Sequence, residues 1–242
     1  MKFCKLAQVQ PEEDSHPIRD ENLPPNLPLP PALKPTLEPS SQEEVYRSEI
    51  EDFLLGGVRT PVLPQNYWGL QAELSEHMRG VLLNWLVEVH QKYKLMGDTY
   101  FLMVRLIDLY LAVEPVPRAK LQLLGITALW VAAKYTETYQ VPKIQNLVYI
   151  CDNAYRPEDI IAMEGRLLLA TGFHALVSSS PLAHFELVQH HARLAEKDYW
   201  LGRYLLEATT FDLALLRFPP AVLAYALSFF IKRLRGYSTH GE

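Results

Sequence analysis

Apolar residues recur at helical spacing along most of the chain, and one stretch between residues 118 and 135 is apolar on nearly every side. Between Leu121 and Ala133 only Gln122 and Thr127 are polar. A helix that is apolar around its whole circumference is buried by other elements of a folded domain. The run is also shorter than the roughly 20 apolar residues of a bilayer span. We therefore predict a core helix and no membrane segment.

Four further helices are expected around this core helix. The first of them follows Ser75, which is placed to cap it, and its apolar residues recur at i, i+3, i+4, i+7 and i+8. Asp98 or Thr99 is expected to cap the next, and Pro157 at a first-turn position opens the last. The five helices are expected at residues 76–94, 98–113, 118–135, 142–150 and 157–170.

The helical pattern starts again after residue 180. Two amphipathic stretches are followed by a helix expected at residues 219–235, whose residues 221–231 are rich in small residues and apolar all round, like the core helix. We interpret this segment as the third helix of a second copy of the same unit. The sequence stops at residue 242, before a fourth and a fifth helix, so an incomplete repeat is expected. Because alternating strand patterns are absent, the fold class is predicted to be all-α.

Composition changes sharply near residue 41. Nine of the 18 prolines lie in residues 1–40, among acidic and serine clusters and without apolar periodicity, so residues 1–41 are expected to be a disordered tail. The tail contains a PxxP match at Pro28–Pro31, for which a stiff spacer is favoured over a docking site. The remaining divisions are an N-terminal helix and linker at 42–75, the five-helix unit at 76–173 and the partial repeat at 180–236.

Charge and motif content disfavour several classes of function. The net charge is −5 and the basic residues are dispersed, which disfavours nucleic acid as a partner. The two cysteines, Cys4 and Cys151, offer neither a disulfide framework nor a CxxC metal site. No motif of a hydrolase, a metalloprotease or a phosphate-binding loop is present, and His184, His190 and His191 do not share a helix face. We therefore expect no enzyme activity, cofactor or metal, and the absence of a signal peptide predicts the nucleus or cytoplasm.

Three charged residues lie inside apolar helical stretches. They are Arg79, Asp108 and Glu164. Because a buried ion is costly unless it is paired, each needs a partner. Arg79 and Asp108 are on sequential helices joined by a short loop, so they are the predicted pair; the alternative is that either one extends to a helix edge.

Several ordered motifs resemble the cyclin box of A- and B-type cyclins. Met78 to Val89 resembles the family pattern MRxILxDWLxEV, and Tyr46–Ile50 resembles the helix that precedes the box. Further matches follow in the family's order at Ile107–Leu111, Lys120–Gly125, Ala132–Tyr135 and Met163–Leu167. The resemblance is close over residues 44–173 and looser over 180–235, and it identifies the chain as a member of the cyclin family, of an atypical kind.

The resemblance implies a five-helix box that binds and activates a cyclin-dependent kinase in cell-cycle control. Lys134 and Glu164 match the residues that contact the kinase's regulatory helix, and Glu137 belongs to the same charged edge. Arg79 and Asp108 match a buried pair of the family. The alternative is a cyclin-like scaffold that binds peptides or proteins and activates nothing.

The resemblance also implies a groove for RxL-type substrate or inhibitor peptides. Glu88 would bind the basic residue of such a peptide, and Trp85 would form the floor for its leucine; plain core burial is the alternative for Trp85. Asn84, Thr136 and Arg156 depart from the family pattern, which weakens the expected kinase affinity more than the expected fold. The residues that match the groove are Met78, Val81, Leu82, Trp85, Glu88, Leu121 and Gln122.

Overall fold

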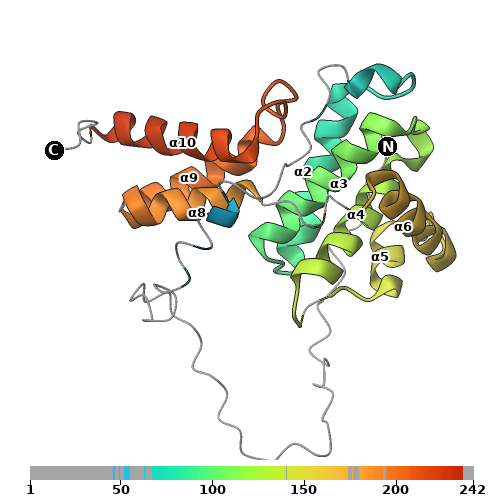
Figure 1. Ribbon diagram of the computed structural model, residues 1–242. Helices are drawn as coiled ribbons and strands as arrows, with labels where there is room; N and C mark the ends of the chain where they lie inside the picture. Colours follow the sequence, from blue (N-terminus) through green and yellow to red (C-terminus); the bar gives the residue numbers. More distant parts are fainter. Residues whose placement is uncertain are drawn as a thin grey trace, which may run out of the picture.

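The structure is a computed structural model that describes residues 67–139, 141–173, 180–192 and 195–236, together with positions 46, 49, 52–54, 63 and 176. Every regular element in this part of the chain is helical (Figure 1). The predicted all-α fold class is confirmed. The expected tail at residues 1–41 lies outside the described residues, as does most of the N-terminal helix expected near residues 46–50.

The first unit has five α-helices, with α4 at its centre. The central helix α4 packs against α2, α3 and α6, and Figure 1 shows it between α2 and α3 on one side and α5 and α6 on the other. The elements are η2 (Tyr67–Leu70), α2 (Glu76–Lys92), α3 (Gly97–Val113), η3 (Arg118–Lys120), α4 (Leu121–Thr136), α5 (Ile144–Ile150) and α6 (Pro157–Thr171).

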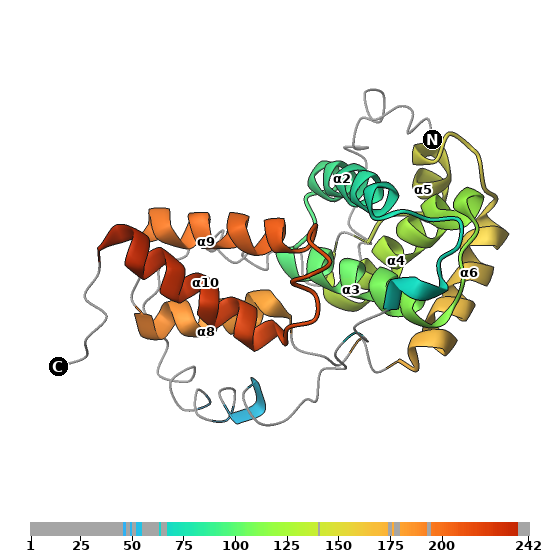
Figure 2. The same ribbon diagram turned by 90° about the horizontal axis from the view of Figure 1, so that it is seen from above.

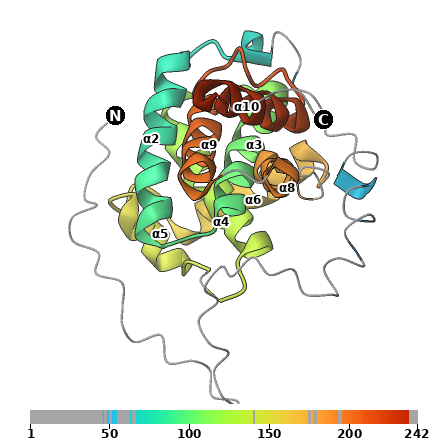
Figure 3. The ribbon, with the colours of Figure 1, turned by 90° about the vertical axis from the view of Figure 1, so that its left-hand side faces the viewer.

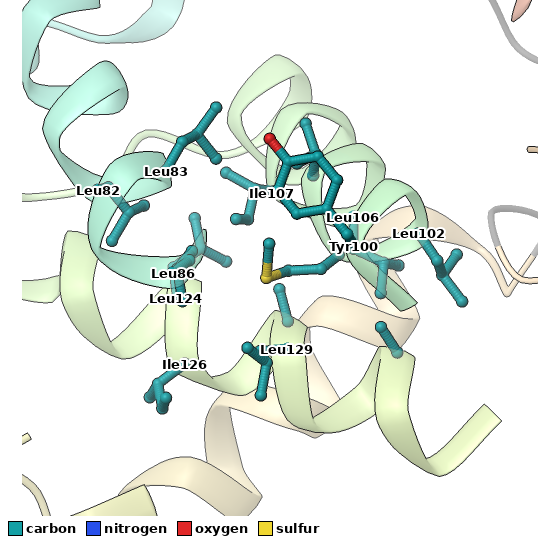
Figure 4. Close-up of a cluster of buried hydrophobic side chains, with 14 of the residues drawn as sticks. Leu82, Leu83, Leu86, Tyr100, Leu102, Leu106, Ile107, Leu124, Ile126 and Leu129 are labelled. Carbon is teal, nitrogen blue, oxygen red and sulfur yellow. The ribbon is translucent and has the colours of Figure 1, made fainter. Parts of the chain in front are cut away.

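The core forms where α2, α3 and α4 meet. Figure 4 shows leucine and isoleucine side chains of these helices pointing toward one another, and Leu82, Leu86 and Leu124 have no exposed surface. Gly125 permits the close approach of α2 to α4, because a Cβ atom there would lie 2.8 Å from Leu82 Cδ1. The apolar run predicted to be a core helix is therefore enclosed, as expected.

The beginnings of α2, α3 and α6 show how far capping could be predicted. Ser75 caps α2 as expected, because its side chain accepts a hydrogen bond from the backbone N–H of Met78. The prediction that Asp98 or Thr99 caps α3 is wrong: α3 begins at Gly97, and Glu137 at the end of α4 accepts the N–H of Met96 at 2.6 Å. A carboxylate from another helix thus occupies the positive end of α3.

At α6 the departure at Arg156 leaves one half of a capping box in place. Asp159 accepts a hydrogen bond from the backbone N–H of Arg156 at 2.9 Å, and this bond does not need a serine or threonine at the N-cap.

A second layer of helices packs beside the first unit. It consists of α8 (Pro181–Ala192), α9 (Glu196–Thr209) and α10 (Pro220–Arg235), and α10 packs against both α8 and α9 (Figure 2). Gly202 on α9 is the closest approach: a Cβ atom there would lie 2.1 Å from Phe185 on α8 and 2.9 Å from Ile231 on α10. In the side view of Figure 3 this layer lies in front of α3, and α8 packs against α3.

A buried ion pair joins α2, α3 and the second layer. Arg79 donates from Nε and Nη2 to the two carboxylate oxygens of Asp108, each at 2.7 Å, and from Nη1 to the carbonyl oxygen of Thr210 at 2.8 Å. Arg79 and Asp108 are each only 1% exposed. The pairing predicted from the cost of buried charge is present, and its third bond to the turn after α9 was not foreseen.

Replacing Arg79 is expected to destabilise the fold strongly. Arg79→Met removes three hydrogen bonds and leaves the Asp108 carboxylate buried without its counter-ion. The free energy of unfolding in urea should fall by about 3–5 kcal/mol. The matched control is Arg79→Met with Asp108→Leu, which should recover most of the loss; a double variant as unstable as the single one would contradict the explanation.

Two glycine substitutions should change stability in opposite directions. Gly202→Ala gains helix propensity but drives a methyl group into the Phe185 ring, for a net loss of about 1–2 kcal/mol. Gly165→Ala on α6 meets nothing within 4 Å and should gain about 0.5–1 kcal/mol. Urea denaturation of both variants tests this, and a stabilised Gly202→Ala protein would disprove tight packing between α8, α9 and α10.

Candidate protein-interaction site

Lys134 and Glu164 meet at one edge of the first unit. Lys134 lies in the last turn of α4, and its Nζ donates a hydrogen bond to Glu164 Oε1 on α6. The Lys134 side chain is 36% exposed and the Glu164 side chain 20% exposed. The pair is therefore already formed, on two helices that pack against each other, and remains accessible from solvent. We call it the Lys134–Glu164 edge.

A residue of the predicted core helix, Trp130, lies beside the Lys134–Glu164 edge. Trp130 is half-buried, and its ring centroid lies 3.7 Å from Lys134 Nζ. Its Nε1–H donates to the carbonyl oxygen of Pro142 at 3.1 Å. The spacing of four residues between Trp130 and Lys134 was the available signal, because residues at i and i+4 share a helix face.

Glu137 is positioned differently from Lys134 and Glu164. Its Oε1 atom accepts hydrogen bonds from the Met96 N–H and from the Thr99 hydroxyl, so the carboxylate is committed to the start of α3. Thr136 adds no charge, and its hydroxyl donates to the Ala132 carbonyl oxygen. The predicted contact role of Glu137 is untested, and the structure gives it a role in holding α3 to α4.

Large apolar side chains are exposed on the same elements. Tyr135 and Ile161 are more than half exposed, and Tyr139, in the segment after α4, is 95% exposed. Aromatic residues beside a few charges are typical of protein–protein interfaces. An edge of this composition is suited to binding another protein.

The residues predicted to line a peptide groove on α2 and α4 differ in burial. Leu82 and Leu121 have no exposed surface and Trp85 is 3% exposed, because all three belong to the core between the two helices. Their predicted contact with a peptide is untested. The accessible members are the half-buried Met78, Val81 and Gln122 and the exposed Glu88.

The described residues offer little for chemistry. Burial raises the pKa of the Cys151 thiol to about 12, so this thiol is not a nucleophile at neutral pH. Among the described side chains, which exclude those of His190 and His191, no group of three or more His, Cys, Asp and Glu residues is placed to hold a metal ion. None of the helices in the described ranges is long and apolar enough to cross a membrane.

Comparison with known proteins shows which family the chain resembles. Residues 57–174 match the cyclin N-terminal domain. The chain is 35% identical over 182 residues to cyclin-B2-2 of Arabidopsis thaliana, covering 74% of this chain and 41% of that protein. It is 37% identical over 191 residues to cyclin-A2-1 of Oryza sativa subsp. japonica, covering 76% and 38%, respectively. It is 37% identical over 164 residues to G2/mitotic-specific cyclin-B2 of Macaca fascicularis, covering 68% and 41%.

A solved structure shows the same fold. The crystal structure of a viral cyclin from herpesvirus saimiri superposes with a TM-score of 0.64 at 15% identity, over 80% of this chain and 83% of that one. The chain spans about two fifths of the length of the cited sequence relatives. The ordered motifs, the matching domain and the fold agree, and the chain belongs to the cyclin family.

Proposed function

We propose that this protein is the activating regulatory subunit of a cyclin-dependent serine/threonine protein kinase, acting in cell-cycle control in the nucleus, the cytoplasm or both. The observation that carries the proposal is the Lys134–Glu164 edge, where a cation and a carboxylate are already paired and still accessible. The chain contributes a surface and the kinase supplies the catalysis.

The proposed mechanism is a shift between two states of the kinase. Kinase activity requires an ion pair between a strand lysine and a glutamate of the regulatory helix, and the position of that helix controls this pair. A partner that binds the active position more tightly moves the population toward it. In this chain the Lys134–Glu164 edge would hydrogen-bond the end of the regulatory helix, while exposed apolar residues such as Tyr135 cover its side.

The rigidity of α4 supports this mechanism. The helix is enclosed by α2, α3 and α6 up to its last turn, so Lys134 projects from a backbone that does not need to be ordered on binding. A preformed contact avoids part of the entropy cost of association. The buried part of the unit therefore holds the exposed last turn of α4 in place.

The alternative is a scaffold that binds RxL-type peptides without activating a kinase. It is supported by Glu88, an exposed carboxylate on the same helix, α2, as the half-buried apolar residues Met78 and Val81. Such a site would bind a basic residue by charge and a neighbouring leucine by apolar contact. The two functions use different faces and can coexist, so each has its own test.

Removing either member of the Lys134–Glu164 edge should weaken kinase binding. Lys134→Ala and Glu164→Ala each leave the other charge unpaired when the interface closes, and binding should weaken by about 2–5 kcal/mol. Calorimetric titration against a purified panel of cyclin-dependent kinases, with a phosphorylation assay of each mixture, measures this.

The control for these variants is their own stability. The pair is partly exposed in the free chain, so the free energy of unfolding should change by less than about 1 kcal/mol. Kinase binding that persists unaltered in both variants, or no binding to any member of the panel by the unmodified chain, would refute the activator function.

Neutralising Glu88 should weaken peptide binding specifically. Glu88→Gln removes the carboxylate that would accept charge-assisted hydrogen bonds from an Arg-x-Leu peptide, with an expected loss of about tenfold or more. Fluorescence anisotropy with a labelled peptide tests this, and Glu76→Gln, which changes an exposed acid at the start of the same helix, is the matched control. Equal affinity of the Glu88→Gln and unmodified chains would exclude the scaffold as described.

A further inference from the structure

The indole of Trp130 makes two polar contacts with the Lys134–Glu164 edge and the segment that follows it. Its ring face is turned to Lys134 Nζ, with the centroid 3.7 Å away. On its other side, Nε1–H donates to the Pro142 carbonyl oxygen at 3.1 Å, immediately before α5 begins at Ile144. The ring also packs against the hydrophobic core. Trp130 is thus fixed at its nitrogen and by packing, with one face directed to the ammonium group.

The Lys134 side chain needs a contact that restricts its rotamers, and the Trp130 ring provides one. A lysine side chain has a flexible four-carbon stem, and holding it in one geometry costs rotamer entropy. An ion pair that is one fifth to one third exposed recovers only part of that cost. The negatively polarised face of a tryptophan ring attracts an ammonium group and restricts where it can lie. Without the ring, Lys134 would have many solvated positions away from Glu164.

We propose that Trp130 is the positioning residue of the Lys134–Glu164 edge. Its ring holds the Lys134 ammonium where it meets Glu164, and its N–H anchors Pro142, shortly after the exposed Tyr139, to the turn of α4 that precedes Lys134. One side chain therefore sets the relative position of the charged pair and of the segment beside it. The consequence for kinase binding rests on the function proposed above; the positioning itself belongs to the free chain.

Two substitutions separate the two contacts. Trp130→Phe keeps an aromatic face near Lys134 but has no N–H for Pro142. Trp130→Leu removes both the face and the donor while leaving an apolar side chain to fill the core. Both are expected to fold, and thermal unfolding followed by circular dichroism checks each one.

The first measurement needs no kinase. In a chain labelled with carbon-13 at the lysine ε position, the ε-methylene protons of Lys134 should be shifted upfield by the ring current, with the signal assigned by its loss in Lys134→Arg. The shift should persist in part in Trp130→Phe and vanish in Trp130→Leu. An unshifted signal in the unmodified chain, or a shift that survives Trp130→Leu, would overturn the proposal.

The second measurement is a double-mutant cycle on kinase affinity. Trp130→Leu should weaken binding about three- to tenfold when Lys134 is present, and less than about twofold in a Lys134→Ala background. Equal losses in the two backgrounds would show that Trp130 acts independently of Lys134 and would overturn the positioning role. If Lys134→Ala and Glu164→Ala leave kinase binding intact, the proposed function fails, while the nuclear magnetic resonance result still decides what Trp130 does to Lys134.

Discussion

The arrangement of the helices depends on the hydrogen bonds of the buried Arg79 guanidinium. An ion in the interior is tolerated only when its charge and its donors are satisfied, and here α2 supplies the cation, α3 the carboxylate and the turn after α9 a carbonyl oxygen. Three separate parts of the chain must therefore meet at one point. Apolar packing alone would permit α2 and α3 to slide along each other, but a bidentate pair permits one register.

With α2 and α3 fixed, the central helix has little freedom. Apart from the half-buried Gln122 in its first turn and the buried Thr127, α4 is apolar until its last turn, and α2, α3 and α6 cover it, so its charged side chain lies at its C-terminal end. Trp130, Lys134 and the Glu137 carboxylate all belong to this end of the helix. The same end also holds the start of α3, through the hydrogen bond from Met96 to Glu137. Glu137 thus lies at the same end of α4 as the proposed binding edge and also holds α3 to α4.

Sequence reasoning succeeded where a local pattern or a large energy decided the outcome. Helical periodicity located α2 through α6, and the cost of buried charge paired Arg79 with Asp108. It failed where the partner came from a distant part of the chain. The carboxylate at the start of α3 comes from Glu137, 41 residues after Met96, and no pattern around Asp98 encodes it. The burial of Leu82 depends on the space above Gly125, and the orientation of the Trp130 ring depends on Pro142.

The two helical layers contribute unequally to the proposed binding edge. α10 resembles α4 in the apolar run at residues 221–231, yet among the described elements it packs closely only on α8 and α9, and Phe229 and Phe230 remain more than half exposed. It cannot hold a terminal turn as rigidly as α4 does. Every residue of the Lys134–Glu164 edge, and Trp130 beside it, lies within α4 and α6. The second layer acts on that edge at a distance, by supplying the Thr210 carbonyl oxygen that completes the Arg79 pair and keeps α2 and α3 in register around α4.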